Sequence, residues 1–72
     1  MTSESTVREA LRTIVDNRHA KSLNYAINYA QAGITMTGEE LRVQCLYVLN
    51  NMSHWRGEVA KAVRMTLKTF TK

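Results

Sequence analysis

Apolar residues recur along this chain at three- and four-residue intervals, the spacing that places side chains on one face of an α-helix. The pattern predicts four helices joined by short connections, at about residues 6–16, 20–32, 38–51 and 54–69. The sequence contains no proline, and no segment alternates apolar and polar residues in the way that marks a strand. We therefore predict an all-α fold, a small antiparallel bundle of four short helices.

The 72 residues leave room for one domain, and we place it at residues 6–72, after a flexible N-terminal tail at residues 1–5. A chain this short buries only about 60% of its unfolded surface, so its own core is expected to be marginal. The tail is polar and contains an acid, which does not fit a secretory signal. No apolar run approaches the roughly 18 residues that a membrane span needs. Since a single cysteine excludes disulfides within the chain, we expect a cytoplasmic protein.

Capping signals indicate where two of the helices begin. Thr37 is followed three residues later by Glu40, the spacing of a capping box, in which each side chain accepts a free backbone N–H of the first turn. Thr6 and Glu9 have the same spacing at the start of the first helix. We therefore expect Thr37 and Thr6 to be N-cap residues.

The connection between the first two helices is less clearly marked. Residues 16–19 interrupt the apolar pattern, but they contain neither glycine nor proline. One bent helix reaching Ala32 therefore stays open as the alternative to two separate helices. Gly33 follows, and we expect it to close the second helix in the left-handed conformation that glycine adopts readily.

The four helices differ in their number of apolar faces. The first and the fourth are apolar on one side, which is all that a helix of a four-helix bundle needs. The second and the third each carry an aliphatic stripe and, on the other side, a second apolar stripe. The residues expected to be buried together in the core are Leu11, Ile14, Leu23, Ile27, Leu41, Cys45, Val48, Leu49, Val59, Val63 and Leu67.

The second stripe contains Tyr25, Tyr29 and Ala32 in the second helix, and Val43, Leu46 and Tyr47 in the third. We take Tyr25, Tyr29, Val43 and Tyr47 as its candidate contact residues. One interpretation is that the first and fourth helices cover the second stripes within an irregular monomer. The other is that the four candidate contact residues form an association surface, most simply for a second copy of the chain. We favour the second interpretation, because the chain is too short to fill two cores and because tyrosine combines a large ring with a hydroxyl that tolerates water.

Positive charge is concentrated in the last helix. The chain has ten basic and six acidic residues, a net charge of +4, and residues 53–72 account for the whole excess. Their basic side chains are Arg56, Lys61, Arg64, Lys68 and Lys72. Such a stripe could contact nucleic-acid phosphates, but cations near a helix C-terminus are favoured by the helix dipole without any ligand. We therefore interpret it first as a solvated surface and keep phosphate contact as the alternative.

Two more specific uses of these helices do not fit the sequence. In a helix-turn-helix DNA reader the helix after Gly33 would enter the major groove, but that helix is the most apolar one in the chain. A membrane-surface role for the last helix would use Trp55 and Phe70, which core packing explains as well. We therefore expect neither a standard helix-turn-helix nor a membrane partner.

The sequence offers little for catalysis. His19, His54 and Cys45 show no catalytic or metal-ligand spacing, and there is no glycine-rich phosphate loop. Cys45 lies in an aliphatic stripe, where a small buried thiol is the usual role. We predict neither enzyme activity nor a cofactor.

The function that the sequence favours is a non-enzymatic helical module that self-associates and acts through protein contacts. Its small size is typical of accessory proteins of bacteria and phages. The alternative is a small nucleic-acid-associated protein that contacts phosphates through the basic side of the last helix.

Overall fold

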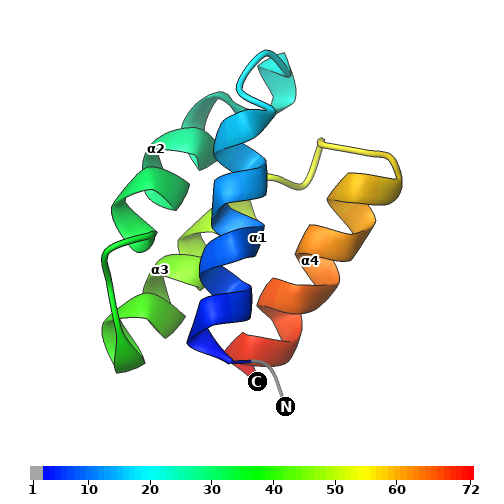
Figure 1. Cartoon of the computed structure of the whole chain (residues 1–72). Coiled ribbons are helices and arrows are strands. Elements are labelled where there is room, and N and C mark those ends of the chain that lie inside the picture. The colour runs from blue at the N-terminus through cyan, green and yellow to red at the C-terminus, as the bar shows by residue number, and fades with distance from the viewer. Residues whose placement is uncertain (1–2) are drawn as a thin grey trace.

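The computed structural model of this chain describes residues 3–72, apart from the side chains of Ser22 and Asn24. Within that range every regular element is helical, which confirms the all-α prediction. The elements are α1 (Glu4–Asp16), the short 3₁₀ helix η1 (Lys21–Leu23), α2 (Asn24–Gly33), α3 (Gly38–Asn51) and α4 (Glu58–Thr71). Consecutive α-helices run in alternate directions, as expected for an antiparallel bundle (Figure 1).

The helices pack as a closed ring around one core. α1 contacts α2 and α4, and α3 contacts the same two helices. Figure 1 shows α1 in front, α2 and α3 side by side, and α4 on the other side of α1. In such a ring each helix needs a single apolar face.

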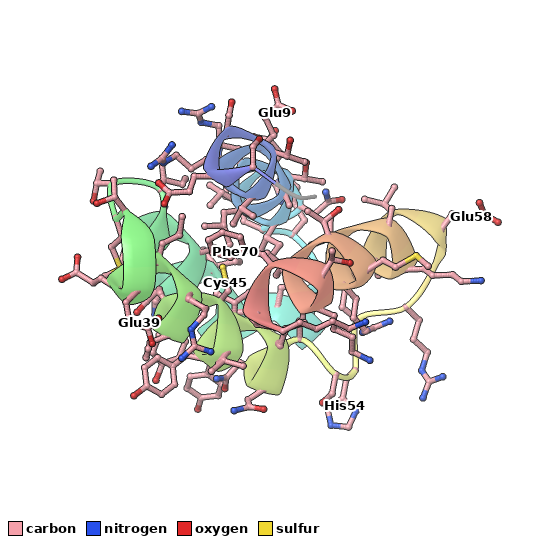
Figure 2. The ribbon with its side chains drawn as sticks, turned by 90° about the horizontal axis from the view of Figure 1, so that it is seen from below. Glu9, Glu39, Cys45, His54, Glu58 and Phe70 are labelled. Carbon is pink, nitrogen blue, oxygen red and sulfur yellow. The ribbon has the colours of Figure 1, made fainter. Side chains whose placement is uncertain are left out.

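The buried side chains come from every α-helix, from η1 and from the loop before α4. They are Val7, Ala10, Leu11, Ile14, Leu23, Ala26, Ala30, Leu41, Cys45, Val48, Met52, Trp55, Ala60, Val63 and Leu67. Figure 2 shows Cys45 and Phe70 between the helices, whereas the labelled acids point away from the core. Most of the predicted core is confirmed. Ile27 and Leu49 are only partly buried, and the prediction for Val59 is wrong, because that side chain is 51% exposed.

The first helix begins earlier than predicted. Its N-cap is Ser3, whose Oγ accepts the backbone N–H of Thr6 at 3.2 Å, so the N-cap prediction for Thr6 is wrong. Glu4 and Ser5, which lie within the predicted tail, belong to α1. Residues 1–2 of that tail lie outside the described part. This additional first turn places the Glu4 carboxylate next to the start of α3.

That contact replaces the predicted capping box of α3. Thr37 is the N-cap residue as expected, but its side chain makes no capping hydrogen bond. Instead, the N–H of Gly38 donates to Oε2 of Glu4 at 2.8 Å. Arg8 completes the connection, since its Nη2 donates to Glu4 Oε1 at 3.0 Å and to the carbonyl of Met36 at 3.1 Å. The first turn of α1 therefore holds the loop between α2 and α3.

The first two helices are separate, so the alternative of one bent helix is wrong. Residues 17–20 form a turn, and Asn17 is the C-cap residue of α1. Its Nδ2 donates to the carbonyl of Thr13 at 2.7 Å, in addition to the backbone N–H of Asn17, which donates to the same carbonyl at 3.2 Å. The regular part of the second helix begins at Asn24 rather than at residue 20, after the 3₁₀ turn.

Gly33 has a different role from the predicted one. It is the last residue of α2 and does not have a positive φ; Ile34, the C-cap residue, is in the right-handed helical region. A Cβ at position 33 would lie 2.9 Å from Cδ1 of Leu11 and 3.3 Å from Cγ of Gln44. The glycine is therefore needed for the close approach of α2 to α1 and α3, not for a left-handed cap.

The last helix begins at Glu58, four residues later than predicted. Trp55 lies in the preceding loop, where its side chain is buried. Nη2 of Arg64 donates to the carbonyl of Trp55 at 2.8 Å and to that of Met52 at 3.4 Å, which ties the loop to α4. Gly57, with φ at +114°, makes the turn into the helix. As a result Ala60, rather than Val59, faces the core.

Candidate protein interface

The residues predicted to form an association surface lie on the outside of α2 and α3. Tyr25 is 72% exposed, Tyr47 48% and Tyr29 38%, while Val43 is partly buried. Leu46, which we did not predict as part of the surface, is 39% exposed beside them on α3. We call these five residues the tyrosine face. None of them lies in the buried core.

Helix geometry explains why the tyrosines face outwards. Tyr25 and Tyr29 are four residues apart, as are Val43 and Tyr47, so each pair forms one stripe on its helix. The inner stripes of the same helices, such as Ala26 with Ala30 and Cys45 with Val48, are buried. The two stripes of each helix thus point in different directions, as the sequence pattern indicated.

Contacts between α2 and α3 hold the two parts of the tyrosine face together. The ring centroids of Tyr29 and Tyr47 are 5.7 Å apart with an interplanar angle of 30°, a separation typical of favourable aromatic pairs. Nε2 of Gln44 in α3 also donates to the carbonyl of Tyr29 in α2 at 2.9 Å. The face is therefore formed within one copy of the chain, before any partner binds.

The tyrosine face is also free of charge. Residues 22–38 and 43–53, the segments from which it is built, contain no Asp, Glu, Lys or Arg. Depletion of charged residues, together with enrichment of tyrosine, distinguishes the centre of a protein interface from ordinary surface. The helical pattern already placed Leu46 on the outer side of its helix with Val43 and Tyr47, and its 39% exposure adds it to the candidate contact residues.

The predicted cations of the last helix have different roles in the structure. Arg56, Lys61, Lys68 and Lys72 are exposed. Arg64 is half-buried, and its guanidinium bonds the loop carbonyls described above. Trp55 is buried and Phe70 partly buried against the core, so neither ring projects from the outer side of α4.

The other reactive side chains do not come together. Cys45 is buried, and desolvation raises the pKa of its thiol to about 11, which keeps it in the unreactive protonated form. His54 is exposed on the loop before α4 (Figure 2). Over residues 3–72, no three His, Cys, Asp or Glu side chains are placed to hold a metal ion. No helix in the same range is long and apolar enough to cross a membrane.

A shallow groove of about 340 Å³ lies between α1 and α4. The side chains that line it recur at matching helical intervals: Thr6, Glu9, Ala10 and Thr13 from α1, and Val59, Ala62, Val63 and Thr66 from α4. The exposed Val59 lines this groove, and Ala60 next to it faces the core.

Comparisons with known proteins add no relative. No protein-family model matches the chain, and no curated protein or solved structure matches it either. The functional argument therefore depends on the surface of this molecule.

Proposed function

We propose that this protein is a non-enzymatic helical module that self-associates through the tyrosine face and acts through protein contacts. The observation that supports the proposal is the exposure of three tyrosines and Leu46 on one uncharged surface of α2 and α3. Exposed apolar side chains scattered singly are ordinary on a small protein, but a contiguous patch of them indicates a binding surface. Tyrosine is also among the residues that contribute most to the free energy of association.

A second copy of the chain is the partner that we propose. The same face on two copies can meet across a twofold axis, because an isologous contact requires only one self-complementary patch. The absence of charge on this face removes the like-charge repulsion that such a contact would otherwise create. A small domain with a limited core also gains stability from association. We further propose a cytoplasmic location, since a single cysteine leaves the chain without the disulfides that stabilise many small secreted domains.

The test is the double variant Tyr29→Glu, Tyr47→Glu, measured by light scattering over a concentration series and by circular dichroism. We expect the parent protein to show a mass above 8.2 kDa that rises with concentration. The double variant should remain helical and become monomeric, because a buried carboxylate opposes an apolar contact.

The matched control is Val59→Glu, Met65→Glu. These are the other large apolar side chains that are exposed among the described residues, 51% and 67% respectively, and both lie on α4. The control should keep the mass of the parent. A monomeric parent would contradict the proposal, and so would a control that dissociates as fully as the tyrosine variant.

A further inference from the structure

The fold gathers cations from two distant parts of the sequence on the side of the molecule formed by α3 and α4. The exposed cations of α4 and its preceding loop are joined by Arg42 of α3, whose Nη1 lies 3.5 Å from the carbonyl of Thr71 at the end of α4. We call this surface the cationic face. Its members are Arg42, Arg56, Lys61, Arg64, Lys68 and Lys72.

The distribution of charge over the molecule is uneven. Glu39, which pairs with Arg42, and Glu58 at the start of α4 are the acids next to the cationic face. Six cations and two acids give this side a charge of +4, which equals the net charge of the whole chain. The four remaining cations and four remaining acids cancel, so the rest of the surface is neutral as a whole.

Three lysines on this face are available to a ligand. Lys61, Lys68 and Lys72 are exposed, and over residues 3–72 the ion pairs join Arg8 to Glu4 and Arg42 to Glu39, not these lysines to an acid. Along the helix axis, Lys61 and Lys68 are separated by about 10 Å, and Lys68 and Lys72 by about 6 Å. The lysines therefore form a row along α4 that could follow a chain of negative charges.

Arg64 lies within this row but acts differently. Its guanidinium donates to two backbone carbonyls, so it adds positive potential while its side chain stays fixed against the loop. Arg42 is likewise held, by hydrogen bonds from Nε and Nη2 to the Glu39 carboxylate. The exposed donors of the face are Arg56 and the three lysine ammonium groups. The lysines act as point charges and do not offer the planar fork that reads a base edge.

We propose that the cationic face binds the phosphate backbone of nucleic acid without sequence preference. A row of lysines without an acidic partner, on the face that accounts for the whole net charge of a small protein, is the electrostatic footprint of such binding. Release of counterions from the nucleic acid supplies most of the affinity in such complexes. The two faces adjoin on α3, where Arg42 lies one helical turn before Leu46, but the row of lysines lies on α4, away from the tyrosines of α2 and α3.

The test uses fluorescence anisotropy with a labelled 20-nucleotide DNA, both single-stranded and duplex, from about 20 to about 200 mM salt. We expect the parent to bind at the lowest salt and to lose affinity steeply as salt rises. Lys61→Gln, Lys68→Gln, Lys72→Gln should weaken binding at least about tenfold and reduce the slope of log affinity against log salt by about 2, because each lost contact contributes about 0.7–0.9.

The matched control removes the same charge from elsewhere, as Arg12→Gln, Arg18→Gln, Lys21→Gln. These three side chains are also exposed, and their loss should change affinity no more than about threefold. Failure of the parent to bind either DNA at the lowest salt would overturn the proposal. It would also be overturned if both triple variants weakened equally, which would mean that only net charge matters. A third contrary result is binding to vesicles containing phosphatidylserine but not to DNA.

Discussion

α1 and α4 are apolar on one side, whereas α2 and α3 are apolar on two. In a ring of four helices each one contacts two neighbours and the common core, and that accounts for one apolar face per helix. The structure uses the aliphatic faces of all four in this way. The second faces of α2 and α3 are left without a cover from their own chain, and they carry Tyr25, Tyr29 and Tyr47.

The contrast teaches that composition alone does not separate core from interface. Leu41 and Leu46 have the same side chain and lie five residues apart on α3, yet Leu41 is fully buried and Leu46 is exposed. Their positions around the helix decide the difference, because five residues correspond to a rotation of about 140°. A residue on the inner stripe should matter for folding, and one on the outer stripe for association.

The largest expected effect compares these two leucines. Leu41→Ala should lower the free energy of unfolding by about 2–5 kcal/mol, because it leaves a cavity in the core. Leu46→Ala should lower it by less than about 1 kcal/mol, since much of the side chain is already in contact with water. Urea unfolding at low protein concentration, where association is weakest, measures both. Equal losses would remove the distinction between inner and outer faces of α3.

A pH titration tests the inner face of α3 through Cys45. The unfolded chain loses the thiol proton near the ordinary pKa of 9.0, whereas burial raises the pKa in the folded chain to about 11. Between these values the unfolded state holds fewer protons, so raising the pH favours unfolding. The parent should lose up to about 2 kcal/mol of stability over this range relative to Cys45→Ala.

Urea unfolding of the parent and of Cys45→Ala at about pH 8 and about pH 10.5 gives this difference. The comparison with the alanine variant removes the contribution of lysines and tyrosines that titrate in the same range. A stability gap between the two proteins that does not change with pH would place the thiol in contact with water.

The smallest expected effect compares the first turns of α1 and α3. Ser3→Ala removes a side chain that accepts a backbone N–H, and it should cost about 0.5–1 kcal/mol. Thr37→Ala should cost less, because Thr37 makes no capping hydrogen bond and Glu4 already accepts the N–H of Gly38. The unfolding temperatures of the two variants and of the parent show which substitution costs more stability. A greater loss for Thr37→Ala would mean that the capping box operates in solution.

The helical pattern in the sequence determined the number of helices, their inner stripes and the outward position of the tyrosines. These properties follow from the rotation of about 100° per residue along any helix, so they are local and can be read without a fold. Uncharged segments 22–38 and 43–53 likewise belong to the sequence itself. The concentration of positive charge in residues 53–72 is also visible in the sequence, and four of the five cations named from it are exposed: Arg56, Lys61, Lys68 and Lys72.

Only the tertiary structure decided the features that depend on residues far apart in the chain. The start of α1 depends on Glu4 reaching Gly38, and the use of glycine at position 33 depends on the approach of Leu11. The loop that delays the start of α4 contains the buried Trp55. Arg42 joins the cationic face because its guanidinium contacts the carbonyl of Thr71 at the end of α4. Contacts between helices set the rotation of each helix about its axis, and the spacing of apolar residues within one helix does not predict which contacts form.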